Sequence, residues 1–502
     1  MNRLTGKSLI AGSWQADEQQ SRFRAYSPLT DTDLEPVYIN VSKLEVNQAC
    51  MEAEKAFYQY CESTKDQRSV LLNTIADEIL ALGEPLIELT HNETGLPVAR
   101  LQAERGRTVN QLRYFAELLH APLLQEQEDH GEPSREPVAK PHTRLGYLPL
   151  GPVAVFGASN FPYAFSVAGG DTASALAAGC TVVVKGHPAH PGTSELIAVA
   201  TTRALAKCGL PQGVFSLLQS TEANTSHALV QHPAIKAIGF TGSLRVAEQL
   251  QLSIDKRKVR IPFYAELGSV NPQIILAERA KESGKDVVAD LTDSLMMGQG
   301  QFCTSPGIWL LPEQHVGLAQ HAADYLKTKA SAPLLTRGIR SAFNRRQDII
   351  AQQPGVSLLG TSQTSAPHHA TAYLYQVSAS DFITHSVLRE EVFGPSAILV
   401  TYRDEAELNT CLAALEGQLT ASVHGTDGDL LAYQGLIRTL SHKVGRLIFN
   451  QMPTGVEICH AMNHGGPYPA SSDIKSTSVG GRALERFVRP ICYQNMPLHL
   501  FR

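Results

Sequence analysis

The stretch GQGQFCTSPG, residues 298–307, sets Cys303 among glycines and small polar residues. Glycine lets the backbone approach a ligand closely, and little side-chain bulk in this stretch would screen the sulfur. A thiol in such a setting could act as a nucleophile once it loses its proton. An isolated cysteine is more often a small buried core residue, so the motif alone leaves both interpretations open.

Two further segments carry groups that could assist a nucleophile. In GASNFPYAF, Asn160 follows an apolar run, and its side-chain amide could donate a hydrogen bond to a developing oxyanion. In FYAELGSVNP, Glu266 stands in a mostly apolar stretch, where loss of water would raise the pKa of its carboxyl group and suit it to general-base chemistry. The competing interpretations are an Asx-turn for Asn160 and a structural ion pair for Glu266.

A second set of residues could bind a phosphorylated ligand. Lys185 ends the apolar run VVVK, at the edge where doubly wound sheets bind their ligands. Gly242 and Ser243 in GFTGS precede an expected helix, whose free N–H groups would favour a phosphate. In LREEVFGP, either Glu390 or Glu391 could accept hydrogen bonds from a ribose diol. The GxGxxG fingerprint of the usual dinucleotide-binding fold is absent, so a cofactor site cannot be predicted from that motif.

Three residues in EICHAMNHGG, Cys459, His460 and His464, are of types that bind metal ions. The two histidines stand at i, i+4 spacing, which on a helix would place both rings on one face. The spacing fixes no further acidic or thiolate ligand, so the sequence predicts no metal site.

These groups need a scaffold, and the hydrophobic pattern predicts an α/β one. Residues 44–125 carry apolar residues at helical spacing, and residues 125–142 are polar, charged and proline-bearing, as in a loop or hairpin. From residue 151, short β-branched runs alternate with helical segments, which indicates a parallel sheet covered by helices. A second such series begins at NPQIIL and places Cys303 near the end of its first long helix. The tail RPICYQNMPLHLF is expected to be extended and could pair with another subunit.

Composition narrows the class of protein. The chain has 502 residues, enough for two or three domains, with 43% hydrophobic and 18% charged residues. A net charge of -5 and the lack of a basic run argue against a nucleic-acid or membrane-surface role. Neither a signal peptide nor a bilayer-spanning apolar run is apparent. Eight cysteines without paired spacing predict reduced thiols and a cytoplasmic protein.

Each motif is weak alone, but their order resembles that of the aldehyde dehydrogenase superfamily over about residues 8–495. The motifs that carry this likeness are GFTGS, ELGSVNP, GQGQFCT and EEVFGP. Longer stretches such as GQFCTSPG, PTGVEICHAMNHGGPYPASSD and STSVGGRALERFVRPICYQN resemble one branch in particular. That branch contains α-ketoglutaric semialdehyde (2,5-dioxopentanoate) dehydrogenases and a bacterial NADP-dependent fatty aldehyde dehydrogenase.

The resemblance implies a catalytic sequence. Cys303 would add to the aldehyde, the resulting thiohemiacetal would give hydride to a nicotinamide, and water would cleave the thioester. Asn160 and the backbone N–H of Cys303 would hold the oxyanion, and Glu266 would activate the water and could also activate the thiol. Two departures from the family pattern stand out. Ser159 replaces an aromatic residue, and Ala483 replaces a second acid, which would leave Glu266 without a proton-relay partner.

The resemblance also implies a cofactor site. Lys185 would lie at the adenosine ribose, Ser243 with Gly242 at the pyrophosphate, and Glu391 at the nicotinamide ribose with Phe393 nearby. Where NAD-preferring members often carry a glutamate, this chain has Pro188. Because nothing acidic would oppose a 2′-phosphate, the sequence predicts NADP as the preferred cofactor, with NAD still possible.

The substrate follows less directly. A dicarboxylic semialdehyde needs a cation in the tunnel, and Arg107, on a helix that borders the family's tunnel, is the predicted one. Arg105 and Arg113 share that helix. Phe161 and Phe165 would instead give the tunnel aromatic walls, which suits a medium- or long-chain fatty aldehyde. Two rival interpretations are a CoA-acylating enzyme, which Glu266 argues against, and a non-catalytic binding protein of the same fold.

The sequence also predicts the fold class and the domain boundaries. We expect two doubly wound parallel-sheet domains plus a small β oligomerisation arm. The predicted segments are a cofactor-binding domain (1–124 and 150–260), a catalytic domain (261–465), and an arm with tail (125–149 and 466–502). Pairing through the arm predicts a homodimer or a dimer of dimers.

Overall fold

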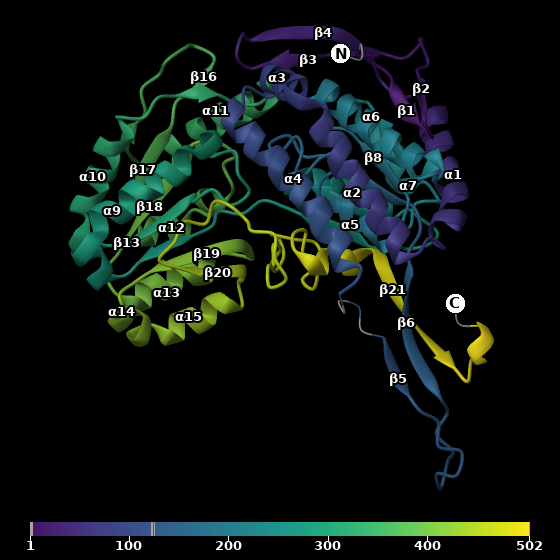
Figure 1. Ribbon diagram of the computed structural model, residues 1–502. Coiled ribbons are helices and arrows are strands. Elements are labelled where there is room, and N and C mark those ends of the chain that lie inside the picture. Colours follow the sequence, from purple (N-terminus) through teal and green to yellow (C-terminus); the bar gives the residue numbers. More distant parts are fainter. Residues whose placement is uncertain (1–3, 122–123, 125, 501–502) are drawn as a thin grey trace.

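The computed structural model describes residues 4–121, 124 and 126–500. Two lobes built around separate sheets lie side by side, and a narrow arm projects from beneath one of them (Figure 1). Among the described residues, no helix combines the length and the apolar character needed to cross a bilayer.

The first sheet has seven strands in the order β11-β10-β7-β8-β9-β1-β2. In that order the strands are Phe263–Glu266, Ala237–Thr241, Val153–Phe156, Val182–Lys185, Phe215–Leu218, Ser8–Ile10 and Ser13–Gln15. The five strands from β11 to β9 run parallel, and β1 and β2 add an antiparallel edge. The strands β7, β8 and β9 are almost entirely buried, which explains why the sequence shows them as continuous apolar runs.

Within the described residues, eight helices belong to this lobe, and the four at the N-terminal end come first in the chain (Figure 1). They are α1 Lys43–Tyr60, α2 Lys65–Ala81, α3 Gly83–Thr94, α4 Val98–Leu118, α5 Gly170–Ala178, α6 Pro191–Lys207, α7 Ala223–Gln231 and α8 Leu244–Ile254. A two-stranded ribbon, β3 (Arg22–Ser27) and β4 (Thr32–Ile39), lies near the N-terminus. Reciprocal capping boxes at Ser42 and Thr64 begin α1 and α2.

The second sheet also has seven strands, in the order β15-β17-β18-β13-β12-β19-β20. In that order they are Ser357–Thr361, Tyr373–Ser378, Ser396–Tyr402, Ile308–Pro312, Gln273–Ile275, Gln418–His424 and Val444–Phe449. All of them pair in parallel except the antiparallel edge strand β15. A short pair, β14 (Ala332–Pro333) and β16 (His369–Ala370), lies outside this sheet.

The helices of the second lobe are α9 Ala277–Met296, α10 Gly317–Leu326, α11 Arg337–Ala351, α12 Ala379–Thr384, α13 Glu405–Ala414, α14 Asp427–Ala432 and α15 Gln434–Ser441. Short 3₁₀ turns occur at Gln212–Val214, Met297–Gly300, Glu313–His315, Ser386–Arg389, Gly481–Phe487 and Leu498–Leu500. Cys303 follows α9 and its terminal 3₁₀ turn, as the sequence predicted.

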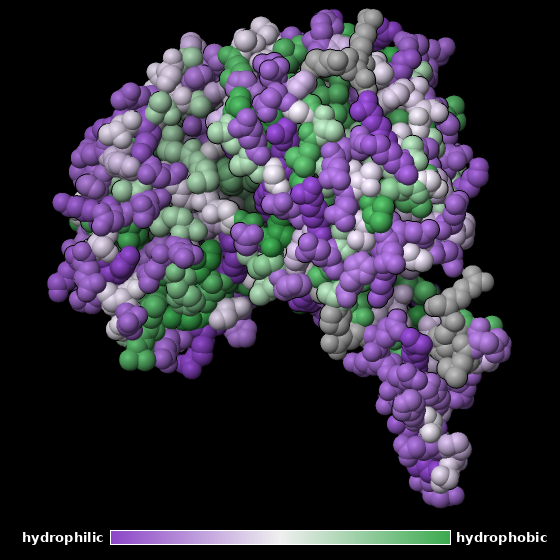
Figure 2. Space-filling model, viewed as in Figure 1, coloured by the Kyte–Doolittle hydropathy of each residue, from purple (hydrophilic) through white to green (hydrophobic). Residues whose placement is uncertain are grey.

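The arm is a three-stranded antiparallel sheet made from two distant parts of the chain. Strand β6 (Thr143–Pro149) pairs with β5 (Gln127–Asp129) on one side and with β21 (Val488–Gln494) on the other. The described C-terminal residues therefore lie beside the hairpin near residue 143 (Figure 1). Side chains toward the tip of the arm are mostly hydrophilic on the face shown in Figure 2.

The predicted fold class is confirmed: two parallel-sheet α/β lobes carry a small β arm. The sequence did not reveal that both large sheets are mixed, because short edge strands such as β1 and β15 lack the apolar signature of central strands. The domain boundaries remain predictions, and the one between 124 and 125 falls beside residues outside the described part of the chain.

Candidate active site

One edge of the first sheet gathers most of the predicted site. The parallel strands β7, β8, β10 and β11 end at this edge, and Asn160, Lys185, Ser243 and Glu266 lie at or just beyond those ends. Because parallel strands share one carboxyl edge, residues from distant parts of the sequence become neighbours there. This is the position that the strand–helix alternation predicted for them.

Cys303 meets this edge from the second lobe. Its Sγ atom lies 3.4 Å from Nε2 of His464, and that nitrogen lies 2.9 Å from Oε1 of Glu266. The other carboxylate oxygen of Glu266 accepts a hydrogen bond from the Ser478 hydroxyl. Glu266 and His464 are buried, whereas Cys303 is partly exposed to a pocket. The structure thus brings a thiol, an imidazole and a carboxylate into contact.

The pKa values of these groups depend on one another. Burial raises the pKa of the Cys303 thiol well above its usual value, and the neighbouring Glu266 charge raises it further. Burial also acts to raise the pKa of Glu266, but the charge of His464 and hydrogen bonds from His464, Ser478 and Cys303 outweigh it and leave that pKa lowered. The sequence prediction of a raised pKa for Glu266 is therefore wrong, because it had no means of placing His464 beside the carboxylate.

The segment that carries His464 and Ser478 is held against β11 by backbone pairing. Leu267 N–H donates to the Ala470 carbonyl at 2.8 Å, and Ser472 N–H donates to the Ala265 carbonyl at 3.0 Å. No helix forms over residues 456–466, so the i, i+4 interpretation of His460 and His464 is wrong. His460 packs against Tyr114 with ring centroids 5.4 Å apart, while His464 turns inward to Cys303. Ala483 supplies no second acid, and Ser478 and His464 contact Glu266 in its place.

The loop that bears Cys303 is fixed from two directions. The side-chain amide of Asn160 donates to the Gln301 carbonyl at 2.9 Å, which places this predicted oxyanion donor beside the Cys303 loop. The side-chain amide of Asn271 donates to the carbonyls of Cys303 and Ser305, both at 2.9 Å. Asn271 itself has a φ of 47°, a left-handed conformation that asparagine tolerates better than most residues. It lies in the ELGSVNP motif, which was the one sequence signal for it.

A pocket of about 1250 Å³ opens beside Cys303. Its lining includes Arg107, Tyr114, Phe161, Phe165, Phe302, Cys303, Arg446, Met452, Met462 and His464. The predicted substrate residues Arg107, Phe161 and Phe165 therefore share one pocket with the thiol. Arg105 and Arg113 instead contact Gly83 and Asp77 outside the pocket lining.

Two arginines of this pocket face it without a carboxylate partner among the described residues. Arg107 donates to the Val456 carbonyl at 3.1 Å and lies over the Phe165 ring at 5.3 Å. Arg446 donates to the carbonyls of Pro453 and Gly455, and its Nε is buried without a hydrogen-bond partner in the described structure. Sequence reasoning missed Arg446, because its position in β20 marks it only as an interruption of an apolar strand.

A third arginine positions the oxyanion segment. Arg100 donates to the Asn160 carbonyl at 2.7 Å, and its guanidinium lies 5.1 Å from the Phe161 ring centroid and 4.8 Å from that of Phe302. It therefore connects α4, the Asn160 loop and the Cys303 loop, and no sequence motif indicated it.

The residues predicted to hold a dinucleotide also fit such a ligand. Burial lowers the pKa of Lys185 to about 8, and no described residue forms an ion pair or hydrogen bond with its ammonium group. Ser243 caps α8 by accepting from Val246 N–H, and Gly242 precedes it. Pro188 lies three residues beyond Lys185 and is partly exposed. A partly buried cation lacking an acceptor, at the same sheet edge as the N-terminus of α8, suits an anionic or diol-bearing ligand.

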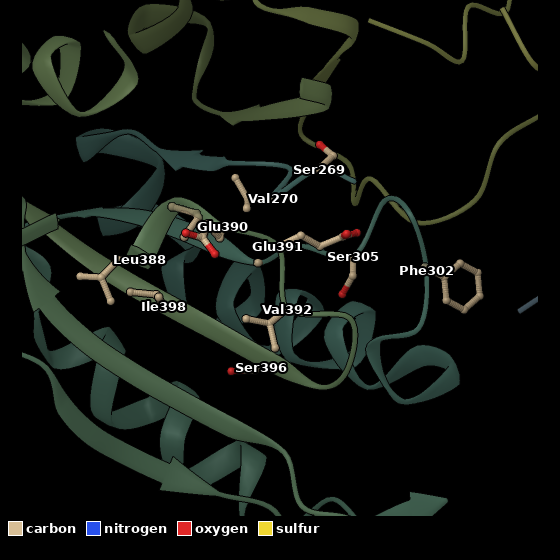
Figure 3. A pocket seen from close by; sticks show the side chains of 12 residues that line it. Ser269, Val270, Phe302, Ser305, Leu388, Glu390, Glu391, Val392, Ser396 and Ile398 are labelled. Carbon is tan, nitrogen blue, oxygen red and sulfur yellow. The ribbon is translucent and has the colours of Figure 1, made fainter. Parts of the chain in front are cut away.

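Glu390 and Glu391 have different surroundings in the structure. Glu390 forms a 2.9 Å ion pair with Arg346 and is exposed, which makes it a structural residue. Burial raises the pKa of Glu391 to about 7, and its carboxylate lies beside Ser305 on the side toward Phe302 (Figure 3). A Cβ on Gly268 would lie 2.3 Å from Oε2 of Glu391, so a larger residue there would displace this carboxylate. Phe393, two residues on, is partly buried.

Comparisons with known proteins identify the family of this chain. A model of the aldehyde dehydrogenase family matches residues 14–481. The chain is 44% identical over 501 residues to α-ketoglutaric semialdehyde dehydrogenase 2 of Azospirillum brasilense, covering 99% of this chain and 95% of that protein. It is 40% identical over 515 residues to α-ketoglutaric semialdehyde dehydrogenase of Acinetobacter baylyi, covering 99% and 94%.

Solved structures show the same fold at lower identity. Betaine aldehyde dehydrogenase from Staphylococcus aureus superimposes with a TM-score of 0.84 at 19% identity, covering 100% of this chain and 98% of that one. NADP-dependent glyceraldehyde-3-phosphate dehydrogenase from Bacillus halodurans, solved with NADP, gives 0.82 at 22% identity, covering 98% and 99%. The chain belongs to the aldehyde dehydrogenase family, whose enzymes oxidise aldehydes with NAD(P).

Proposed function

We propose that this enzyme oxidises α-ketoglutaric semialdehyde (2,5-dioxopentanoate) to 2-oxoglutarate, through a thiohemiacetal and then a thioester on Cys303. The observation that carries the proposal is the Cys303–His464–Glu266 contact at a pocket that also presents Arg107 and Arg446. The two full-length relatives named as α-ketoglutaric semialdehyde dehydrogenases support the same substrate.

Activation of the thiol is the first chemical task. Because burial and Glu266 keep the pKa of Cys303 high, the resting thiol holds its proton and needs a base. Glu266, whose pKa is lowered and whose carboxylate accepts a hydrogen bond from the Cys303 thiol, is placed to take that proton as the sulfur attacks the aldehyde carbon, while the N–H of His464 holds the carboxylate. The side-chain amide of Asn160 would turn from the Gln301 carbonyl toward the new oxyanion.

The later steps use the same residues. A bound nicotinamide would accept the hydride of the thiohemiacetal. Glu266, ionised again because its pKa is lowered and the thiol proton has left to solvent, would take a proton from the water that attacks the thioester. Ser478 and His464 hold this carboxylate toward Cys303 from either side. Because Glu266 is present and is held by two hydrogen-bonding partners, we expect water to cleave the thioester rather than CoA to accept the acyl group.

Charge in the pocket argues for an anionic substrate. A carboxylate on the far end of a short aldehyde could pair with Arg107, and Arg446 adds a second cation that forms no ion pair with a described residue, on the opposite element, β20. The alternative substrate, a medium- or long-chain aldehyde, is favoured by the contacting rings of Phe161, Phe165 and Phe302. An aromatic wall can also pack against the short carbon chain of the semialdehyde.

The experiment that tests this proposal compares kcat/KM for 2,5-dioxopentanoate with kcat/KM for pentanal and a long-chain aldehyde. We expect the acidic substrate to be preferred, and Arg107→Met to lose about 2–4 kcal/mol of transition-state stabilisation, roughly thirty- to a thousandfold, on that substrate alone. Arg113→Met is the matched control, because Arg113 lies on the same helix but pairs with Asp77. Preference for the long-chain aldehyde, or an equal loss on both substrates, would contradict the assignment.

For the cofactor we propose a preference for NADP, with NAD also accepted. Lys185 with Ser243 would hold the adenosine ribose and pyrophosphate, and Glu391 the nicotinamide ribose, with Phe393 nearby. Pro188 presents no negative charge to a 2′-phosphate. Pro188→Glu should move the ratio of kcat/KM values toward NAD by roughly ten- to a hundredfold, about 1–3 kcal/mol. An unchanged ratio in a folded variant would remove this loop from the ribose site.

We also propose that the enzyme works in the cytoplasm as a homodimer or a dimer of dimers. All eight cysteines are free, as a reducing compartment would keep them. The arm offers β5 and β21 as sheet edges that a second subunit could cover.

A further inference from the structure

The reactive residues are also a set of metal ligands. A thiolate, an imidazole nitrogen and a carboxylate oxygen are the three protein donors that zinc prefers. In this structure Sγ of Cys303, Nε2 of His464 and Oε1 of Glu266 all lie within 4.8 Å of one another. The sequence grouped His464 with Cys459 as candidate ligands, whereas the fold gives it Cys303 and Glu266 instead.

The two distances from Nε2 of His464 suit one tetrahedral ion. Zinc bonds of about 2.0–2.3 Å at tetrahedral angles place neighbouring ligand atoms roughly 3.4–3.6 Å apart. The Sγ–Nε2 separation is 3.4 Å, and the Nε2–Oε1 separation of 2.9 Å would need to widen by only a few tenths of an ångström. At 2.9 Å a lone pair on nitrogen and one on a carboxylate oxygen require a positive centre between them. In the metal-free protein that centre is a proton, which a zinc ion could replace.

The surroundings also favour the ion. Thiolate and carboxylate together neutralise the two charges of zinc, so the buried complex with a neutral imidazole carries no net charge. Ser478 donates to the other oxygen of Glu266 and fixes the carboxylate, as outer partners do in zinc sites. Cys303 and His464 both line the pocket, which gives the ion a route in and leaves a fourth position for water.

We propose that Cys303, His464 and Glu266 bind Zn²⁺ reversibly and that this ion switches the enzyme off. On binding, the S–H bond of Cys303 and the N–H bond that links His464 to Glu266 both break, and zinc forms bonds to Sγ, Nε2 and Oε1. Both protons pass to the solvent buffer. No electron is transferred, so a chelator restores the free thiol. The inhibitory consequence rests on the proposed role of Cys303 as nucleophile, because sulfur bound to zinc cannot attack an aldehyde.

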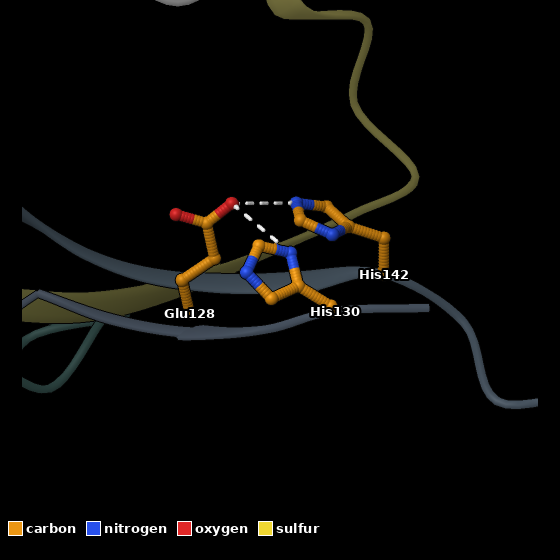
Figure 4. A group of neighbouring side chains, drawn as sticks. All are labelled: Glu128, His130 and His142. Carbon is orange, nitrogen blue, oxygen red and sulfur yellow. Dashed lines mark ion pairs between the residues drawn. The ribbon is translucent and has the colours of Figure 1, made fainter. Parts of the chain in front are cut away.

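A second cluster provides the control for specificity. On the arm, Glu128 Oε1 lies 3.2 Å from Nε2 of His142 and 3.9 Å from Nδ1 of His130 (Figure 4). The strand register explains this, because Glu128 pairs with Arg144 and Asp129 with Thr143, which sets His130 opposite His142 on the same face. This arm cluster has no thiolate and its His130 side chain is 85% exposed, so we expect it to hold zinc less tightly.

The test measures zinc binding directly, by equilibrium dialysis of chelator-treated full-length enzyme, and cobalt binding by its thiolate charge-transfer band. We expect tight binding in wild type and in His142→Ala, which removes the arm cluster. Cys303→Ala and His464→Gln should each weaken it by at least on the order of 10–100-fold, and Cys303→Ala should abolish the cobalt band. Zinc should also protect Cys303 from alkylation by iodoacetamide in wild type.

The outcomes separate this inference from the proposed function. If zinc affinity is lost in His142→Ala but retained in Cys303→Ala, the ion belongs to the arm and the inference is wrong. If chelator-treated wild type oxidises aldehydes yet binds no zinc at Cys303, the inference also fails while the proposed function stands. If zinc binds at Cys303 but no aldehyde is oxidised by the metal-free enzyme, the binding site stands, whereas the proposed function and the inhibitory role that depends on it fail.

Discussion

His464 shows which site residues short sequence motifs can identify and which they cannot. Cys303, Glu266 and Asn160 stand in short motifs whose order indicated their chemistry, and the structure places all three at one site. His464 stood in an equally distinctive stretch, but its spacing from His460 suggested a helix that does not form. Its true partners lie 161 and 198 residues away in the chain, and only tertiary pairing brings them together.

His464 supports a prediction about thiol activation. His464→Gln keeps a hydrogen-bond donor beside Glu266 but removes the charge that lowers the pKa of that carboxylate, so kcat/KM should fall on the order of 10–100-fold. Because burial and Glu266 already raise the pKa of Cys303, alkylation of the thiol by iodoacetamide should also slow and need higher pH. His460→Gln is the control, since His460 packs on Tyr114 and should leave both readouts unchanged. Equal behaviour of the two variants would show that the charge of His464 does not support thiol activation.

Lys185 supports a prediction about pH. The charged ammonium donates to ribose hydroxyls or phosphate, and burial lowers its pKa to about 8, so the binding form is lost as pH rises through that value. Affinity for NADP should therefore weaken between about pH 7 and 9.5 in wild type, far below the pH at which an exposed lysine titrates.

Fluorescence titration with NADPH across this range would check the dependence on Lys185. Lys185→Met should bind more weakly at pH 7 and show a flatter profile, whereas Lys207→Met, a surface variant on α6, should follow the wild type. A wild-type affinity that stays constant through pH 9 would place Lys185 away from the cofactor.

At the scale of elements, the alternation of strands and helices could be predicted because each element shows its own spacing of apolar residues along the sequence. Strands such as β7 and β8 are apolar throughout, and α9 ends where the glycines of the Cys303 loop begin. The pairing of residues 470–472 with β11 could not be predicted, because that segment is polar and forms no regular element. The lowered pKa of Glu266 depends on this pairing, which explains why burial alone gave the wrong direction.

The Cys303 loop yields a prediction about an element. Gly300 has a φ of 64°, and a Cβ there would lie 2.2 Å from the Gly394 carbonyl oxygen. Gly300→Ala should therefore destabilise the fold by about 2–4 kcal/mol and displace the nucleophile, lowering kcat/KM as well as the thermal midpoint. Gly435→Ala is the matched control on α15, where an added Cβ meets nothing within 4 Å. A Gly300→Ala enzyme with wild-type stability and activity would show that the loop is not constrained in this way.

At the scale of the whole molecule, the candidate active site lies where the two lobes meet. The pocket is lined by α4 and the Asn160 loop of the first lobe and by the Cys303 loop and β20 of the second. Two α/β lobes could be predicted from two series of alternating elements, but their relative placement depends on contacts such as Asn160 with Gln301 that no local pattern encodes.

The arm supports a prediction about assembly. If β5 and β21 provide edges for a second subunit, replacing residues 127–142 by a short glycine–serine turn should lower the assembly state in sedimentation velocity. Far-UV circular dichroism should remain that of a folded α/β protein, because this hairpin lies outside both large sheets. An unchanged assembly state would move the subunit interface elsewhere.

The most direct test of the whole account is to look for the acyl group on Cys303. Wild type and Glu266→Gln would be mixed with 2,5-dioxopentanoate and NADP, quenched in acid within one turnover, and digested for mass spectrometry. We predict a thioester on the Cys303 peptide in both, with accumulation in Glu266→Gln alongside a burst of NADPH that is not followed by steady turnover. Turnover without any adduct on Cys303, or equal turnover by Cys303→Ala, would contradict the account.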